Sequence, residues 1–136
     1  MLETAALIGA AGEVLHWHAP RGRTTTHLPD SRGLWDIMWR RRGEIVGVAH
    51  THPGGGPPAP SLTDLTTFDA CELGLGARLR WWIATRDQLR CFVWSGPAPL
   101  VYVDAAPVDA SPPWLAELRR RSGFTRTEPA GPALAV

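Results

Sequence analysis

The sequence predicts a single α/β (α+β) domain in which helices flank a mixed β-sheet. Three observations predict this fold class. The chain has 136 residues, the size of one ordinary domain. Hydrophobic residues make up 44% of it and charged residues 20%, so a packed core can form. Short apolar segments typical of strands alternate with longer segments whose apolar residues recur at helical spacing.

The first half of the chain contains short strands followed by a helix. Residues 4–9 and 13–19 are predicted to form two paired strands. Residues 24–28 are rich in threonine and favour a third strand. A helix is expected to begin at residues 29–31, where Pro, Asp and Ser stand together, and to end at Gly43.

The second half begins with the most strand-like segment, residues 44–52, which ends at a loop rich in Pro and Gly. We then expect a helix, a strand hairpin, a further strand and a last helix, over residues 61–73, 78–85 with 89–94, 100–105 and 112–121. The domain is therefore predicted to cover residues 1–126. Residues 127–136 are small and rich in Pro, which favours a flexible tail.

Charge and cysteine content exclude several classes of protein. A formal net charge of +1 argues against nucleic acid or an acidic membrane surface as the main partner. No apolar run approaches the ~20 residues that span a bilayer, and no secretory signal is visible. Cys71 and Cys91 form neither a CxxC pair nor a disulfide framework, so a cytoplasmic location is expected. Lys and Asn are missing, which is typical of a GC-rich bacterial genome.

The residues that indicate chemistry lie between His50 and Asp64. His50 and His52 are two apart on a predicted strand, so their imidazoles share one face. The chain returns as a helix at Ser61, and Asp64 falls in its first turn. Two nitrogens and one carboxylate oxygen can converge there on one cation. Three protein ligands with an open fourth position are typical of a hydrolytic zinc site.

Each half of this pattern has an ordinary structural interpretation. Ser-x-x-Asp at a helix start closely resembles a capping box, and Ser61 could serve as both cap and catalyst. A second His-x-His, formed by His16 and His18, has no carboxylate at ligand spacing and is expected to be structural. The pairing of His-x-His with Pro, a loop and Ser-x-x-Asp is what favours a metal site.

The segment from His50 to Asp64 resembles the JAMM motif of the JAB/MPN metalloprotease family, HxHP-x7-SxxD, at each motif position. Glu3–Gly9 is similar to the early strand of that family, E-x-x-G-L-L-x-G, with Ala6 where Gly is common. Glu3 precedes His50 by 47 residues, close to the separation in the family. The resemblance implies the JAB/MPN (cytidine-deaminase-like) architecture and a deubiquitinase-like zinc metalloprotease.

The resemblance also implies a role for each residue. His50, His52 and Asp64 would hold Zn²⁺, Glu3 would move a proton from water to the leaving amine, and Ser61 would stabilise the oxyanion. The implied reaction is hydrolysis of a peptide or isopeptide bond at the C-terminus of a ubiquitin-like or sulfur-carrier-like protein.

Two other glutamates are alternative bases. Glu13 follows Gly12 at a strand start and is the second choice after Glu3. Glu44 is six residues before His50 on one strand, about 20 Å away, which is too far to serve the metal.

Two departures from the family affect what is expected. Members usually carry a helix before the glutamate strand, and here Glu3 is almost the first residue. One face of the core would then be open unless the C-terminal helix, a second copy of the chain or another partner covers it. The tight turn at Asp87 and Gln88 leaves no room for the long insertion by which eukaryotic deubiquitinases select chain linkage.

Two alternative functions stay open, a non-catalytic MPN-type binding module and a RadC-like protein tied to DNA. The helix with Trp35, Met38 and Trp39 has apolar residues around much of its circumference. It is expected either to pack wholly in the core or to expose some of them to a ubiquitin-like substrate.

Overall fold

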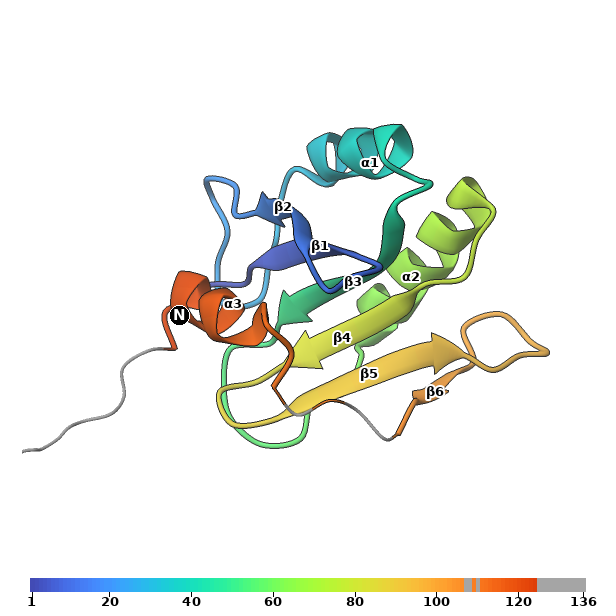
Figure 1. The fold of residues 1–136 in the computed structure, drawn as a ribbon. Helices are drawn as coiled ribbons and strands as arrows, with labels where there is room; N and C mark the ends of the chain where they lie inside the picture. Colours follow the sequence, from blue (N-terminus) through green and yellow to red (C-terminus); the bar gives the residue numbers. More distant parts are fainter. Residues whose placement is uncertain (107–108, 110, 125–136) are drawn as a thin grey trace, which may run out of the picture.

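A six-stranded sheet forms the centre of the computed structural model, which describes residues 1–106, 109 and 111–124 (Figure 1). The strands lie side by side in the order β2-β1-β3-β4-β5-β6. The elements follow the chain as β1 Ala5–Gly9, β2 Val14–His18, α1 Ser31–Arg40, β3 Ile45–Thr51, α2 Leu62–Leu75, β4 Arg80–Ala84, β5 Leu89–Trp94, β6 Tyr102–Asp104 and α3 Leu115–Ser122. The mixed α/β fold class predicted from the sequence is confirmed.

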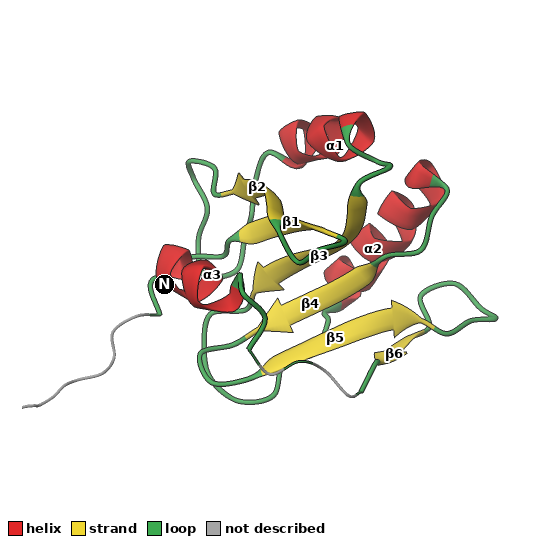
Figure 2. Cartoon of the chain, in the orientation of Figure 1, coloured by secondary structure: helices red, strands yellow, loops and turns green. Residues whose placement is uncertain are grey.

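The direction of the strands decides which loops meet. β3 pairs in parallel with β4, and its other neighbour, β1, is antiparallel to it. His50 therefore lies opposite Ala5 at the start of β1 and opposite Ile83 near the end of β4. The N-terminus of the chain, the loop after β3 and the turn after β4 consequently meet at one edge of the sheet (Figure 2).

α1 and α2 cover one face of the sheet. Their buried residues Met38 and Phe68 join a core cluster with the strands, completed by Leu7, Ile45, Val48, Leu79, Trp81, Ile83 and Phe92. Phe68 stacks on Trp81, with ring centroids 4.2 Å apart. The apolar residues predicted around α1 are partly buried and partly exposed: Met38 is in the core, whereas 45% of Trp39 is exposed.

α3 covers the other face, for which the sequence offered the C-terminal helix, a second copy or another partner as the cover. It lies in front of β1 and β3 in Figure 1, whereas α2 runs behind the sheet. Trp114, Leu115 and Leu118 are buried against apolar residues of three strands, Ala6, Ile8, Ala49 and Ala84. The C-terminal helix thus covers part of the face that lacks a preceding helix.

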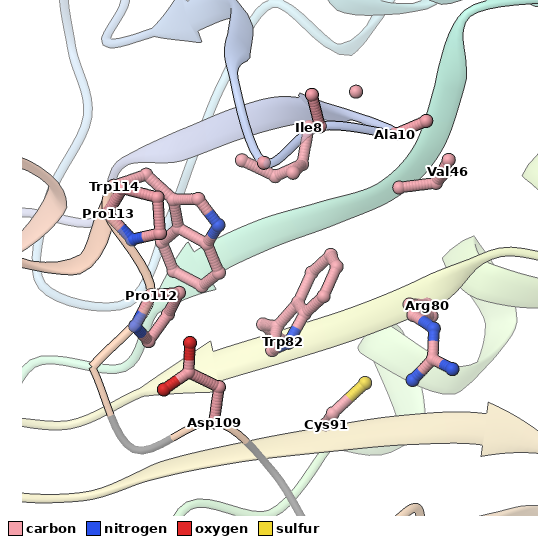
Figure 3. Close-up of a pocket in the computed structure, with 13 residues that line it drawn as sticks. Ile8, Ala10, Val46, Arg80, Trp82, Cys91, Asp109, Pro112, Pro113 and Trp114 are labelled. Carbon is pink, nitrogen blue, oxygen red and sulfur yellow. The ribbon is translucent and has the colours of Figure 1, made fainter.

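A hollow of about 420 Å³ remains on that face, beside α3 (Figure 3). Trp82 and Trp114 form its walls, and Arg80 lies at the far side of Trp82. Its lining includes Val46, four residues before His50 on β3, and the imidazole of His50 lies on the opposite face against Phe68. The hollow is therefore remote from the predicted metal ligands.

Two sequence predictions are wrong. Residues 24–28 form no strand, since their backbone groups bond locally and to the N-terminus: Thr24 N–H bonds the carbonyl of His27, and Thr24 C=O accepts from Glu3. α1 ends at Arg40 and not at Gly43. The predicted tail, residues 127–136, lies outside the described residues. Among the helices that the structure describes, none combines the length and the hydropathy needed to cross a membrane.

Candidate metal centre

The end of β3 places two histidines at one edge of the sheet. His50 is buried, and its ring meets the edge of Phe68 from α2 with centroids 6.3 Å apart. His52 follows the last strand residue, but its N–H still bonds the carbonyl of Ala84 on β4 at 2.9 Å. The backbone of both residues is thereby held by neighbouring strands, and the two ring centroids lie 4.9 Å apart.

The N-terminus of α2 supplies the carboxylate. Ser61 caps the helix: its Oγ accepts from the N–H of Asp64 at 3.0 Å, and Asp64 Oδ2 accepts from the N–H of Ser61 at 2.9 Å. The predicted capping box is confirmed. These reciprocal bonds fix the carboxylate of Asp64 so that it faces the histidines instead of solvent.

Three donor atoms converge at this point. His50 Nε2 lies 3.1 Å from His52 Nε2 and 3.4 Å from Asp64 Oδ1, and His52 Nε2 lies 2.9 Å from Asp64 Oδ2. Ligands about 2.0–2.1 Å from one zinc ion in a tetrahedron lie about 3.3 Å apart, so the spacing fits. Two facing imidazole nitrogens and a carboxylate are also the donor types that zinc prefers.

Within the residues described, this is the one group of three or more His, Cys, Asp or Glu side chains spaced to hold a metal ion. Burial opposes ionisation of Asp64, but hydrogen bonds from both histidines outweigh it and hold the pKa of the carboxyl far below its usual range. The carboxylate therefore stays charged, as a metal ligand must be.

Glu3 lies beside this group. It lies two residues before Ala5, the first residue of β1, which pairs with His50. Burial raises the pKa of the Glu3 carboxyl, and the charge of Asp64 adds to the rise, while His50 and His52 oppose it. The charges of all three candidate ligands thus act on the Glu3 carboxyl, and its raised pKa makes it a stronger proton acceptor than an ordinary glutamate.

The loop after His52 is held by hydrogen bonds that the sequence does not indicate. Asp87, in the turn after β4, accepts a hydrogen bond from the N–H of Gly56 at 2.8 Å. The N–H of Arg86 bonds the carbonyl of Gly54 at 2.7 Å. The turn itself was predicted, but its position beside the loop depends on the parallel pairing of β3 and β4, which the sequence does not display.

The glutamates that were alternative bases, and the second His-x-His, lie away from the candidate metal ligands. Glu13 accepts from the N–H of Ala11 in the turn beyond β1, at the opposite end of that strand from Ala5. Glu44 precedes β3 and pairs with Arg41 at 2.8 Å. His18 is buried, with its Nε2 2.9 Å from the carbonyl oxygen of Pro29, a contact of the kind expected for a structural histidine.

Residues 2–95 match a family described as prokaryotic homologs of the JAB domain. The match covers more than half of the chain, and the chain belongs to this family. A search of curated proteins finds no match. The fold, the family and the His50, His52 and Asp64 group together define a JAB-domain protein with a candidate metal centre.

Proposed function

We propose that the chain is a zinc-dependent metallopeptidase that hydrolyses a peptide or isopeptide bond at the C-terminus of a ubiquitin-like protein. One observation carries the proposal: the donor atoms of His50, His52 and Asp64 lie within 4.8 Å of one another, with the carboxyl of Glu3 close by. A zinc ion held there supplies Lewis-acid chemistry, which polarises a carbonyl and acidifies water.

Glu3 acts as the general base in this proposal. Its carboxylate takes a proton from the attacking water and returns it to the departing amine. Partial burial suits the task, because a raised pKa brings the carboxyl nearer to the operating pH. The charges of His50, His52 and Asp64 act on this side chain, which supports its assignment as the base beside the candidate ligands.

Ser61 stabilises negative charge on the substrate. Its Oγ accepts the N–H of Asp64, so the single hydroxyl hydrogen is still available to another acceptor. That hydrogen can be donated to the carbonyl oxygen as charge develops there. Ser61 thereby combines helix capping with a catalytic role.

The substrate class rests on the family resemblance and on the exposed face of α1. Trp39 is 45% exposed and stacks with Trp35 at a centroid distance of 6.3 Å. Trp35 packs partly against the core, so it can hold the exposed ring of Trp39 in place for contact with an apolar patch on a small protein. The proposal includes action in the cytoplasm, in keeping with two free cysteines. It also includes a protein partner instead of nucleic acid, in keeping with a net charge of +1.

The test combines metal analysis with a cleavage assay. Purified protein should contain about one zinc per chain, and it should release a reporter amine joined to the C-terminal Gly-Gly of a ubiquitin-like protein. His50→Ala should lose zinc and cleavage, and Glu3→Gln should lose cleavage alone. Glu13→Gln is the matched control and should behave as wild type. Equal cleavage by wild type, His50→Ala and Glu3→Gln would reject the proposal.

A further inference from the structure

The carboxyl end of α3 contacts the end of β3, which carries the two histidines, and the N-terminal segment, which carries Glu3, although it lies outside residues 2–95 of the family match. Ser122, the last residue of α3, is 1% exposed. Its hydroxyl lies 2.9 Å from that of Thr51, the residue between His50 and His52. Its carbonyl oxygen accepts the N–H of Leu2 at 2.9 Å.

The hydroxyl hydrogens in this contact can be assigned. Ser122 Oγ donates to the carbonyl of Leu118 at 2.9 Å, which uses its only hydrogen. The contact between the two hydroxyls needs a hydrogen, so Thr51 Oγ1 donates to Ser122 Oγ at 2.9 Å in preference to the carbonyl of Thr4 at 3.5 Å, and it accepts from the N–H of Thr4 at 3.0 Å. The result is a buried chain of hydrogen bonds that runs in one direction from Thr4, the residue before β1, through Thr51 of β3 to Ser122 of α3.

Arg23 fixes the other side of the N-terminal segment. Its Nη1 bonds the carbonyl of Glu3 at 3.2 Å and also the hydroxyl of Thr4, and its Nη2 bonds the carbonyl of Arg121 at 3.3 Å. The N–H of Glu3 is bonded to the carbonyl of Thr24 at 2.8 Å. Both backbone polar groups of Glu3 are thus held, so only its side chain is free to turn.

We propose that Ser122 and Arg23 are positioning residues of the metal centre, with Ser122 acting through Thr51 on the histidine ligands and Arg23 acting through the backbone of Glu3. The inference rests on the proposed function. Thr51 points away from the imidazoles, so anchoring it resists rotation of the strand end that carries them. Such bonds behind metal ligands strengthen metal binding because the ligands need not be ordered when the ion arrives.

The first experiment measures the zinc affinity of metal-free protein by competition with a chelator. Ser122→Ala and Thr51→Val should weaken zinc binding roughly tenfold and alter the visible spectrum of the cobalt(II) form. Thr51→Ser keeps the hydroxyl and should bind zinc as wild type does. Leu115→Val loosens the same helix without touching the hydrogen-bond chain, so it should lower the Tm but leave the zinc affinity unchanged.

The second experiment measures amide hydrogen exchange in the N-terminal segment without metal. Arg23→Lys keeps the charge but lacks the planar fork that reaches two carbonyls, so exchange at Glu3 should be faster. Arg21→Lys, at an exposed position nearby, should leave it unchanged.

The outcomes separate this inference from the proposed function. A wild-type protein that binds zinc, together with a Ser122→Ala variant that binds it within twofold as tightly, would overturn the inference and leave the proposed function standing. Unchanged exchange at Glu3 in Arg23→Lys would overturn the part assigned to Arg23. A wild-type protein that holds no zinc would overturn both.

Discussion

The carboxylate of Glu72, 2% exposed on α2, accepts a hydrogen bond from the indole N–H of Trp81 on β4 at 2.8 Å. It also accepts from the N–H of Leu79 at 2.9 Å, from the hydroxyl of Tyr102 at 2.6 Å and from Arg78 at 2.8 Å. One buried carboxylate therefore connects the helix that carries Asp64 to β4 and β6.

Removal of this carboxylate should destabilise the fold strongly. Glu72→Ala would leave buried donors without an acceptor, and we expect the free energy of unfolding to fall by roughly 3–5 kcal/mol. Urea denaturation measures the change. Arg90→Gln is the control: Arg90 lies 3.7 Å from Asp104 with side chains 43% and 40% exposed, so its loss should cost about 1 kcal/mol or less. Equal effects of the two substitutions would contradict this account of Glu72.

Zinc should stabilise the folded chain through the candidate centre. A ligand at 100 times its Kd adds about 2.7 kcal/mol, which corresponds to a rise in Tm on the order of 10 °C for a domain of this size. Thermal denaturation with and without zinc measures the rise. His52→Ala should abolish it, whereas His16→Ala, which alters a histidine of the other His-x-His, should preserve it. A rise that survives in His52→Ala would place the bound zinc elsewhere.

The raised pKa of Glu3 predicts how cleavage depends on pH. The carboxylate is the active form, so the rate should fall as the pH drops through a pKa above the ordinary glutamate value of about 4.3. Glu3→Gln should reduce the rate by roughly 10²–10⁴ and remove this limb. Zinc content is measured at each pH, because loss of the ion would also lower the rate. If the rate of Glu3→Gln still falls in acid at full zinc content, Glu3 is excluded as the general base.

The raised pKa of Glu3 also predicts how stability depends on pH. The carboxylate, which is the active form for cleavage, is the form that destabilises the fold. Because the folded-state pKa of Glu3 lies above the unfolded one, its contribution favours folding at low pH and is lost as the pH rises through the folded value. Metal-free Glu3→Gln should therefore be more stable than wild type at pH 7, and the difference should disappear in acid. Denaturant unfolding at several pH values measures this. A wild type that is the more stable protein at pH 7 would contradict it.

Asp87 should restrain the loop that follows His52. Asp87→Ala removes the acceptor of the Gly56 N–H, and amide exchange over residues 54–56 should accelerate. The overall free energy of unfolding should change by about 1 kcal/mol or less, since the contact is exposed. Asp36→Ala removes an exposed carboxylate from α1 and is the matched control for charge. Unchanged exchange in Asp87→Ala would mean that the loop is held by its other bonds.

Both thiols should resist modification while the chain is folded. Burial, with the charge of Glu72 adding to it, raises the pKa of Cys71 to about 11, so only about one thousandth is thiolate at pH 8. Burial also raises the pKa of Cys91, although Arg80 opposes the rise. Iodoacetamide at pH 8 should modify neither in native protein and both in denaturant, as mass spectrometry would show. Rapid labelling of native Cys71 would contradict its partial burial on α2.

The candidate metal centre could be predicted because its ligands are local. His50, His52 and Asp64 lie within one strand, one loop and one helical turn, so periodicity and capping place them without long-range information. β5 was predicted at its observed bounds, 89–94, for a similar reason: an apolar segment follows a tight turn.

The features that the sequence did not reveal depend on tertiary contacts. Residues 24–28 have β-branched side chains, but Thr24 bonds Glu3 and His27, and this outweighs their strand propensity. In the sequence, Glu72 cannot be told from a surface residue of a helix, because its hydrogen-bond donors come from other segments of the chain. Ser122 follows three arginines and gives no sign that its hydroxyl reaches Thr51 on β3.

The place of α3 bears on how this chain can be divided. The family match ends at residue 95, before β6 and α3, yet Trp114, Leu115 and Leu118 bury the small residues Ala6 and Ala49 of the sheet. A fragment cut at the end of the match would expose that apolar surface to water and release the N-terminal strand from its anchor. Such a fragment should aggregate on expression, so the boundary of sequence similarity is not the boundary of the cooperative folding unit.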